Sequence, residues 1–423
     1  MINTTNKGRR TSRATRAIRP QGSNTNFASD KAEQSTNRHG RDYSILVHSH
    51  LRWDWVWQRP QQFLSRLSHR HPILFVEEPL AVDGVRTPRA ELRNVDGLPN
   101  VTVLRTEFPP ALMNDRSALD SEQKRLVLAT LAGPLGRVFT RPVQWFYDPM
   151  ATLAFAGQMN ERATVYDCMD QLSQFRGAPP ELIRRERELL TIADVVFAGG
   201  PKIHKAKRLL NPNCHSYGCG VDVRHFGRAL LPETEIPQDI ANLSGPRLGF
   251  FGVVDERMDY PLVAHLAESH PDWNVIIIGP FCKIDPATLP QRPNLHWLGA
   301  RDYGQLPAYV KGLDVCLMPF AINEATEFIN PTKALEYMAT GRPIVSTPVE
   351  DVVLQFADVV HLAATHDEFV SKCERAIAAA DPGRIQEGLR MAERNSWEAI
   401  VAELEAHIDA VLAKRELSEV CAA

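Results

Sequence analysis

The sequence predicts an α/β protein built from two doubly wound parallel-sheet domains. Short apolar runs of strand length alternate with amphipathic helical patterns, and this alternation is typical of parallel sheets. The alternation occurs twice, on either side of a proline-rich segment at residues 227–247. A chain of 423 residues is also too long for one ordinary core and suits two domains of somewhat under 200 residues each.

The first 42 residues form a basic tail, with nine Lys/Arg against three Asp/Glu. The tail has almost no large apolar residues, so it cannot bury enough surface to offset its ordering entropy, and we expect it to be disordered. It lacks the apolar stretch of a secretory signal. A dispensable extension, a transit peptide and a segment that contacts anionic lipid headgroups remain open as interpretations.

The first domain is expected at residues 43–226. Its strand-like runs stand at 43–50, 72–79, 101–107, 142–149, 164–170, 194–200 and 213–222. Helical patterns at 60–68, 181–192 and 201–210 separate several of them. Residues 227–247 are rich in proline and lack a long apolar face, which predicts the linker.

The second domain is expected at residues 248–395. Its strand-like runs stand at 247–254, 274–280, 294–300, 314–320, 343–349 and 358–364, with helices at 260–270 and 306–313. The chain then continues in helical patterns at 367–380 and from 385 onward. In the last segment, 396–423, apolar residues recur at intervals of three and four, which predicts a long C-terminal helix.

The stretch "FINPTKALEYMATGRPIVST" at residues 328–347 predicts a loop, a short helix, a tight turn and a strand. Asn330 is a suitable N-cap, a proline follows it, and Gly341 can end the helix. Lys333 and Glu336 are three residues apart and therefore share one face of that helix. Since the first turn of a helix favours anions, this is a plausible place for a phosphate and the sugar attached to it.

Ligands of open parallel sheets bind at the carboxyl ends of the strands, and several suitable residues follow strands of the second domain. Gly252 lets the chain approach a bulky ligand, and Arg257 is a permanently charged fork suited to a diphosphate. Each residue alone has an ordinary alternative: a strand-to-loop glycine, a solvated charge, or a surface ion pair between Lys333 and Glu336. Their common position at one sheet edge favours a binding site.

Several other classes of protein are disfavoured. Neither half contains G-x-G-x-x-G after its first strand, and no G-x-x-x-x-G-K-[ST] occurs, which argues against a Rossmann dehydrogenase and a P-loop NTPase. The seven cysteines are scattered without a Cys-x-x-Cys pair, as expected of reduced thiols rather than a zinc site. No stretch of eighteen apolar, uncharged residues predicts a membrane span. We therefore expect a cytoplasmic or peripheral protein.

Several motifs occur in the order shown by a known family: "WDWVWQRPQQFLSRL", "LFVEEP", "VYDCMDQLSQF", "ADVVFAGGPKIHKAKR", "GVDVRHF" and "NPTKALEYMATGRPIVST". From about residue 43 to 412, the chain resembles the GT-B glycosyltransferases, above all the family-4-like group 1 enzymes of exopolysaccharide and cell-envelope assembly. The resemblance implies two Rossmann-like domains facing each other across a cleft. The second would hold the nucleotide-sugar, the first would receive the acceptor, and the last helix would cross back to the first domain.

The resemblance also implies roles for donor-binding residues. Glu336 takes the place of the acidic residue that bonds the ribose hydroxyls, and Lys333 that of a cation on the donor diphosphate. The backbone of Leu298, Gly299 and Ala300 would contact the base, and Asn330 and Thr332 would line the helix start. The commoner signature has a glutamate eight positions before Glu336, where this chain has Phe328. This departure leaves the stereochemical outcome open.

The first domain would supply the acceptor side. Trp53 and Trp55 follow the first strand and could stack on sugar rings or enter a lipid headgroup region, with packing inside the domain as the alternative. Arg59 opens the next helix, with a purely structural role as the alternative. Two carboxylates compete as general base, Asp170 and Asp148; the resemblance favours Asp170, and capping of the following helix is its alternative.

The sequence thus predicts a glycosyltransferase that uses a UDP-linked sugar, needs no cofactor and no metal, and acts on a glycan or lipid-linked acceptor. Cations of the protein would offset the leaving-group charge, and no Asp-x-Asp metal motif occurs. Nucleic acid is not an expected partner, whereas an anionic membrane surface is. A nucleotide-sugar-processing enzyme such as a 2-epimerase and a non-catalytic scaffold subunit remain the alternatives.

Overall fold

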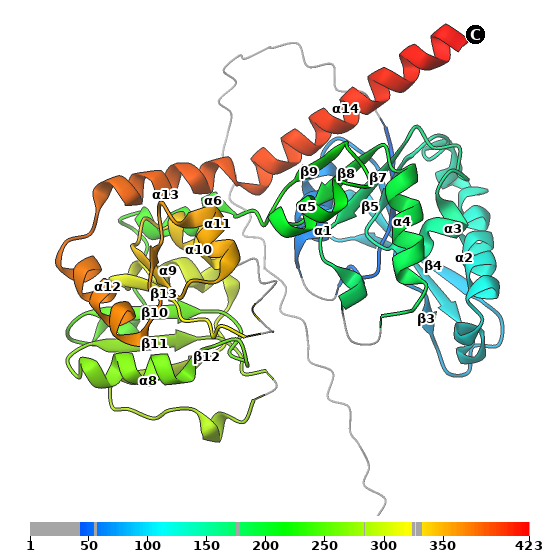
Figure 1. Ribbon diagram of the computed structural model, residues 1–423. Coiled ribbons are helices and arrows are strands. Elements are labelled where there is room, and N and C mark those ends of the chain that lie inside the picture. Colours follow the sequence, from blue (N-terminus) through cyan, green and yellow to red (C-terminus); the bar gives the residue numbers. More distant parts are fainter. Residues whose placement is uncertain are drawn as a thin grey trace, which may run out of the picture.

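The computed structural model describes residues 43–54, 57–174, 178–282, 284–323, 326 and 332–422. These residues form two α/β domains with predominantly parallel sheets, and the C-terminal helices α13 (Pro382–Arg394) and α14 (Trp397–Ala422) run along both domains (Figure 1). The predicted fold class is therefore confirmed. No helix in the described part of the chain has both the length and the apolar character that crossing a membrane requires.

The described part of the first domain forms a nine-stranded sheet in the order β3-β5-β2-β1-β6-β7-β8-β9, with β4 antiparallel to β5 and the other pairs parallel. The strands are β1 (Ile45–His48), β2 (Ile73–Val76), β3 (Leu80–Ala81), β4 (Arg89–Val95), β5 (Leu98–Phe108), β6 (Val143–Phe146), β7 (Ala163–Cys168), β8 (Val195–Ala198) and β9 (Cys214–Ser216). The sequence analysis missed β3 and β4. Strand β4 is largely exposed and rich in charge, so it carries no apolar run.

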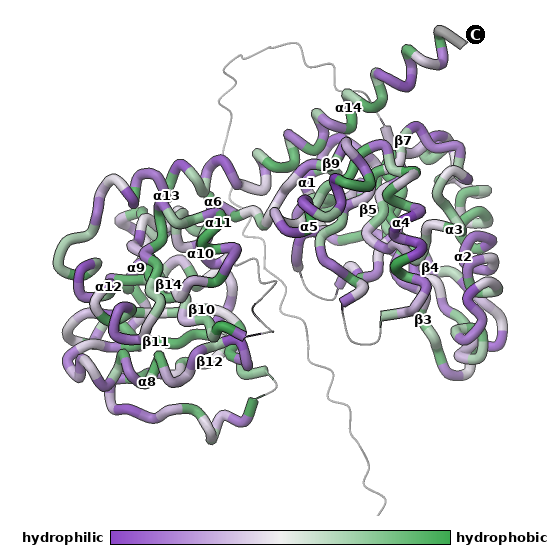
Figure 2. The backbone as a smooth tube through the Cα atoms, viewed as in Figure 1, coloured by the Kyte–Doolittle hydropathy of each residue, from purple (hydrophilic) through white to green (hydrophobic). Residues whose placement is uncertain are grey.

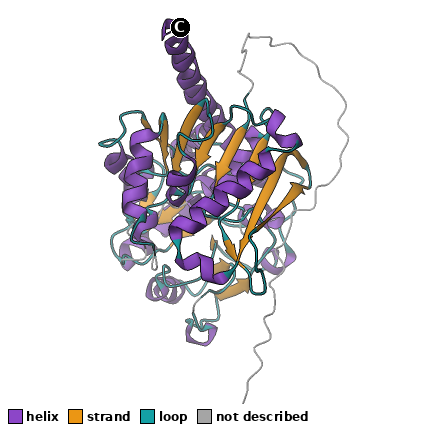
Figure 3. Ribbon diagram, turned by 90° about the vertical axis from the view of Figure 1, so that its right-hand side faces the viewer, coloured by secondary structure: helices purple, strands orange, loops and turns teal. Residues whose placement is uncertain are grey.

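Helices cover both faces of this sheet (Figure 3). They are α1 (Arg59–Leu67), α2 (Arg116–Leu131), α3 (Thr152–Phe155), α4 (Leu182–Ile192) and α5 (Pro201–Lys207). Successive residues of a strand point to opposite faces, so Ile45 and Val47 pack toward α1 and α14, whereas Leu46 packs toward α2, α3 and α4. The strands are consequently buried on both sides, as parallel sheets require.

The described part of the second domain forms a six-stranded parallel sheet in the order β12-β11-β10-β13-β14-β15. This is the 3-2-1-4-5-6 order of the Rossmann fold. The strands are β10 (Arg247–Phe251), β11 (Asn274–Ile278), β12 (Leu295–Gly299), β13 (Val315–Met318), β14 (Ile344–Ser346) and β15 (His361–Leu362). The helices are α6 (Val223–Phe226), α7 (Gln238–Ala241), α8 (Tyr260–Ser269), α9 (Leu306–Lys311), α10 (Thr332–Met338), α11 (Glu350–Phe356) and α12 (His366–Ala378). Figure 2 shows the apolar strands inside this domain and the more polar helices around them.

The chain crosses between the domains at two adjacent points. Val221 and Ser396 form a parallel bridge there, and a Cβ atom on Gly220 would come within 2.5 Å of the Trp397 ring. Val221 and Phe226 already belong to the second core, although the sequence analysis assigned residues up to 226 to the first domain. Single apolar anchors of this kind do not form a periodic pattern. After the second crossing, α14 packs Trp397, Leu404 and Ile408 against the first sheet.

Candidate active site

The predicted pair on α10 is formed and largely buried. Lys333 Nζ lies 3.0 Å from Glu336 Oε2, and the two side chains are only 22% and 15% exposed. Lys333 Nζ also lies 5.0 Å from the centre of the Phe251 ring. The exposure is low for a surface ion pair, and a cation and a carboxylate held together at a domain edge are suited to a ligand that carries both anionic and hydroxyl groups.

Gly252 brings the end of β10 against this pair. Its φ is 152°, and a Cβ atom at this position would lie 2.8 Å from the Phe250 ring and 3.2 Å from Lys333 Cε. Behind it, a Cβ atom on Gly279 would lie 1.6 Å from the Gly252 carbonyl oxygen. The loops after β10 and β11 are therefore in close contact, and only glycines allow it. Since β10 and β13 flank the point where the strand order reverses, this is the expected ligand crevice.

The other predicted donor residues are engaged by the protein itself. Arg257 is bound by Asp255, with Nε donating at 2.9 Å and Nη2 at 2.6 Å, and these hydrogen bonds raise the pKa of the guanidinium. Its charge is therefore partly offset within its own loop, the side chain stays 38% exposed, and its contact with a diphosphate remains a prediction. The carbonyls of Leu298 and Ala300 accept from Arg301, and that of Gly299 accepts from the N–H of Gly279 at 2.9 Å.

Thr332 is the first residue of α10 and is half-buried. Asn330, the predicted N-cap, lies outside the described residues, as do Trp55 and the basic tail.

The sequence analysis did not identify two aromatic residues near Glu336, His225 and Tyr303. His225 stacks on Tyr303 with ring centres 4.1 Å apart and an interplanar angle of 9°, and His225 Nε2 lies 3.0 Å from the Tyr303 carbonyl oxygen. Burial raises the pKa of Tyr303 and lowers the pKa of His225, and the charge of Glu336 acts on both. The motif "GVDVRHF" contains His225, but the sequence could not show its contact with Tyr303, because folding brings the loop after β12 beside it.

In the first domain, three titratable residues follow strands at the corresponding edge. His50 follows β1, Asp148 follows β6 and Asp170 follows β7. His50 acts electrostatically on both carboxylates, and its Nδ1 lies 3.0 Å from the Tyr147 carbonyl oxygen. Strands β1 and β6 flank the reversal of strand order in this sheet. His50 is a residue that sequence reasoning missed, although its position after the first strand was a usable signal.

The two candidate bases differ in their contacts. Asp148 caps the following 3-10 turn, with Oδ1 accepting from the N–H of Met150 at 2.8 Å. Burial raises the pKa of Asp148, although that hydrogen bond opposes the shift. Burial also raises the pKa of Asp170, against the charges of His50 and Arg59. The next 3-10 turn begins at Leu172, so Asp170 lies two residues before it and, unlike Asp148, does not stand at the N-cap position.

Trp53 and Arg59, predicted for the acceptor side with packing as the alternative, are buried, and their contact with an acceptor remains a prediction. Trp53 is 3% exposed and packs edge-on against Phe75, with ring centres 5.2 Å apart. Arg59 Nε donates to Asp167 at 2.9 Å, and its Nη1 donates to the carbonyls after β9. Both residues therefore pack inside the domain, Trp53 against β2 and Arg59 against the segment that follows β9. Trp57, by contrast, is 52% exposed.

Cys219 connects the two halves electrostatically. Burial raises the pKa of its thiol to about 11, and the charges of Asp170, Glu336 and Lys333 all act on it. Asp170 belongs to the first domain and the other two to the second, and Cys219 itself lies next to the crossing between the domains at Val221. The carboxylate of Asp170 and the Lys333–Glu336 pair thus act on the same thiol between the domains. A further contact joins the two domains. Lys202 Nζ on α5 forms an ion pair with Glu350 Oε2 on α11, at a distance of 2.6 Å.

Comparison with known proteins bears on this geometry. Residues 245–379 match the family model described as "Glycosyl transferases group 1", and solved GT-B structures superimpose on most of the chain. The chain has a GT-B fold, and its residues 245–379 are similar to the group 1 glycosyl transferases. The predicted resemblance is thereby confirmed.

Three structures illustrate the likeness. A UDP complex of HepE from Anabaena is 14% identical, with a TM-score of 0.61 and coverage of 88% of this chain and 100% of that one. Sucrose-phosphate synthase from Thermosynechococcus elongatus gives the same four values. An E. coli trehalose-6-phosphate structure with bound UDP-2-fluoro glucose is 13% identical, with a TM-score of 0.59 and coverage of 86% and 99%. At these identities, the likeness concerns the fold alone.

A sequence relative comes from Bacillus subtilis (strain 168). TuaH, whose name assigns it to teichuronic acid biosynthesis as a glycosyltransferase, is 24% identical over 264 residues. The match covers 57% of this chain and 65% of TuaH, which is less than two thirds of the relative. Within the described residues, this GT-B protein has no cluster of three or more His, Cys, Asp or Glu side chains that could hold a metal ion.

Proposed function

We propose that the protein transfers a sugar from a UDP-linked donor to a hydroxyl of a glycan or lipid-linked acceptor during cell-envelope polysaccharide assembly. The group 1 domain at residues 245–379 supports sugar transfer, and the UDP and UDP-sugar complexes among the structural neighbours support the nucleotide. The name of TuaH supports the polysaccharide context. We place the reaction on the cytoplasmic side of the membrane.

The donor site of this proposal is centred on Lys333. The observation that carries it is the contact between Lys333 and Gly252, because the missing Cβ of Gly252 leaves an approach to a cation at the switch point of the second sheet. Lys333 would neutralise the diphosphate, while Glu336 would accept hydrogen bonds from the ribose hydroxyls. In the free protein the two side chains form an ion pair, but Glu336 Oε2 has no hydrogen-bond partner among the described residues, so a ribose hydroxyl can donate to it.

The chemical step of the proposal uses Asp170. Its carboxylate takes the proton of the acceptor hydroxyl, the oxygen attacks the anomeric carbon, and the bond from that carbon to the diphosphate breaks. UDP leaves with its negative charge beside Lys333, so this scheme needs no metal ion. The raised pKa of Asp170 makes its carboxylate a stronger base than an exposed aspartate. The exposed ring of Trp57 takes over the acceptor-stacking role first assigned to Trp53.

Calorimetric titration of the purified chain with UDP tests the donor site, and UDP release from UDP-sugars in the presence and absence of membrane glycolipid extracts tests transfer. The proposal predicts UDP binding and acceptor-dependent UDP release. Epimerisation of the donor sugar without acceptor would indicate the nucleotide-sugar-processing alternative. Absence of nucleotide binding would leave the scaffold alternative.

A further inference from the structure

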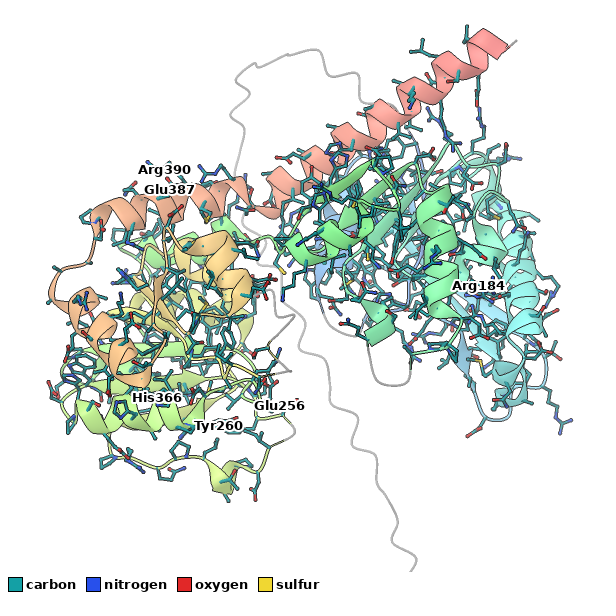
Figure 4. The ribbon with its side chains drawn as sticks, viewed as in Figure 1. Arg184, Glu256, Tyr260, His366, Glu387 and Arg390 are labelled. Atoms are coloured by element: carbon teal, nitrogen blue, oxygen red, sulfur yellow. The ribbon has the colours of Figure 1, made fainter. Side chains whose placement is uncertain are left out.

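A second open groove lies in the second domain, away from Lys333. It has a volume of about 750 Å³ and is formed by the segment 223–231, by the C-terminal end of α10 and by α13. Figure 1 shows α6, α10 and α13 together on one side of this domain, and Figure 4 labels Glu387 and Arg390 on α13. The groove therefore shares α10 with the donor site but lies at the opposite end of that helix.

Four arginines line the groove, two on each wall. Arg224 and Arg228 are four residues apart in the helical segment 223–230, and Arg390 and Arg394 are four residues apart on α13. This spacing puts each pair on one helical face. The α13 arginines share Glu387, at 2.9 Å and 2.7 Å, and their side chains remain 61% and 60% exposed.

Arg224 and Arg228 are exposed, and neither side chain has an ion-pair or hydrogen-bond partner among the described residues. Glu393 is the acidic residue of the lining, so with Glu387 the groove has two carboxylates against four guanidinium groups. Residues 43–423 as a whole carry 39 Lys/Arg against 48 Asp/Glu. A positive groove on an acidic body attracts an anionic ligand.

The remaining lining is apolar: Val223, Leu230, Leu231, Ala339 and Leu389. Leu230 and Leu231 are 54% and 43% exposed, so the two neighbouring side chains offer apolar surface to a ligand in the groove. A ligand that fits must present apolar faces to the leucines and spaced negative charges to both walls. A small inorganic anion would leave the leucines uncovered.

We propose that this groove binds an acidic oligosaccharide, a chain of sugars that carries carboxylates. The C–H faces of its rings cover the leucines, and its carboxylates pair bidentately with the arginines. The open ends let a longer chain continue into solvent. The choice of a glycan over another anion rests on the proposed function, since the polysaccharide being assembled is its natural source, whereas the charge and the shape of the groove do not depend on it.

The position of the groove gives such binding a consequence. Arg224 and Arg228 follow the first crossing between the domains at Val221, and Arg390 and Arg394 precede the second crossing at Ser396. A glycan bound to both walls therefore contacts the segments next to both connections between the domains. The growing glycan is thereby held to the enzyme outside the catalytic cleft.

Titration of the full chain with tetragalacturonic acid, with maltotetraose as a neutral sugar of equal length, tests the proposal. We expect the acidic tetrasaccharide to bind and maltotetraose not to bind. The double variant Arg224→Glu/Arg228→Glu should raise the Kd for the acidic tetrasaccharide at least about tenfold. Arg394→Gln should weaken binding from the opposite wall. Arg86→Glu, an exposed arginine of the first domain, is the matched control and should bind as the wild type does.

The affinity for UDP, measured in the same proteins, separates this proposal from the donor site. Unchanged UDP binding with weakened tetrasaccharide binding supports the groove. Equal tetrasaccharide binding by wild type and both groove variants overturns it, as does competition by UDP. A glutamate peptide of equal charge that binds as tightly as the sugar, or inorganic phosphate that displaces it at equal concentration, also overturns the assignment to a glycan. If the wild type itself does not bind UDP, the proposed function is refuted instead.

Discussion

Lys333 lies directly against Gly252: a Cβ atom on Gly252 would come within 3.2 Å of the Lys333 Cε atom. Two segments that are far apart in sequence, the loop after β10 and the first turn of α10, thus meet at the centre of the candidate donor site. Because Gly252 has no side chain, the side chain of Lys333 can lie against the end of β10.

Gly252→Ala should destabilise the protein and weaken UDP binding. The φ of 152° disfavours any side chain, and the new methyl group would push against the Phe250 ring and Lys333. We expect a loss of about 1–3 kcal/mol in the free energy of unfolding, measured by urea denaturation. Gly304→Ala, where a Cβ atom would meet nothing within 4 Å, is the control and should behave as the wild type does.

Glu336→Gln should reduce the affinity for UDP at least about tenfold, because each hydrogen bond from a ribose hydroxyl to a charged group contributes about 1.5–3 kcal/mol. The loss should be much smaller for 2′,3′-dideoxy-UDP, which lacks both hydroxyls. Titration calorimetry with the two nucleotides measures the difference. An equal loss for both would contradict a ribose contact. Glu368→Gln on α12, which also removes a carboxylate paired with a lysine, should change neither affinity.

Asp170→Asn should abolish most sugar transfer while leaving UDP binding intact, because loss of a general base typically costs about 10²–10⁴ in rate. In the wild type, kcat should rise with pH as Asp170 loses its proton, and this limb should lie above the ordinary aspartate pKa because burial raises the pKa of Asp170. Initial rates across pH 4–8 measure both effects. Asp148→Asn retains a side-chain oxygen for the cap and should keep most activity; the reverse ranking would make Asp148 the base.

Glu405→Gln should loosen the C-terminal helix from the first domain. Burial alone would raise the pKa of Glu405, but hydrogen bonds from His71 and Arg70 outweigh burial and hold the pKa below its ordinary value. This carboxylate therefore contributes stability above the pKa of an unfolded glutamate, and the contribution is lost as pH falls through the folded pKa. We expect the variant to lose about 1–3 kcal/mol of unfolding free energy at pH 7. Glu398→Gln, whose side chain is 57% exposed, should lose much less.

The sheets of both domains were predictable because parallel strands buried on both faces appear as continuous apolar runs. Strand β4 was not predictable in this way, since its residues are mostly exposed and it is held by pairing with β5. The sequence analysis placed segment 221–226 in the first domain, whereas Val221 and Phe226 pack in the second core, and this burial depends on partners far along the chain.

For the candidate site, local spacing predicted the Lys333–Glu336 pair, because residues three apart on a helix always share a face. The sequence could not show that Asp255 engages Arg257 or that Arg59 is bound to Asp167, although both partners are charged. Side-chain partners two residues away in a loop, or 108 residues away in another strand, are set by tertiary structure. The stacking of His225 on Tyr303 was hidden for the same reason.

The central claim is that Lys333 binds the diphosphate of the donor. Titration calorimetry of wild type and Lys333→Met with UDP and with uridine tests this claim most directly, with Lys372→Met on α12 as the control. The ratio of the Kd for uridine to the Kd for UDP measures how much the diphosphate contributes to binding. The account predicts that this ratio is at least about tenfold larger for the wild type than for Lys333→Met. If the two proteins discriminate UDP from uridine equally, Lys333 does not bind the diphosphate and the proposed donor site is wrong.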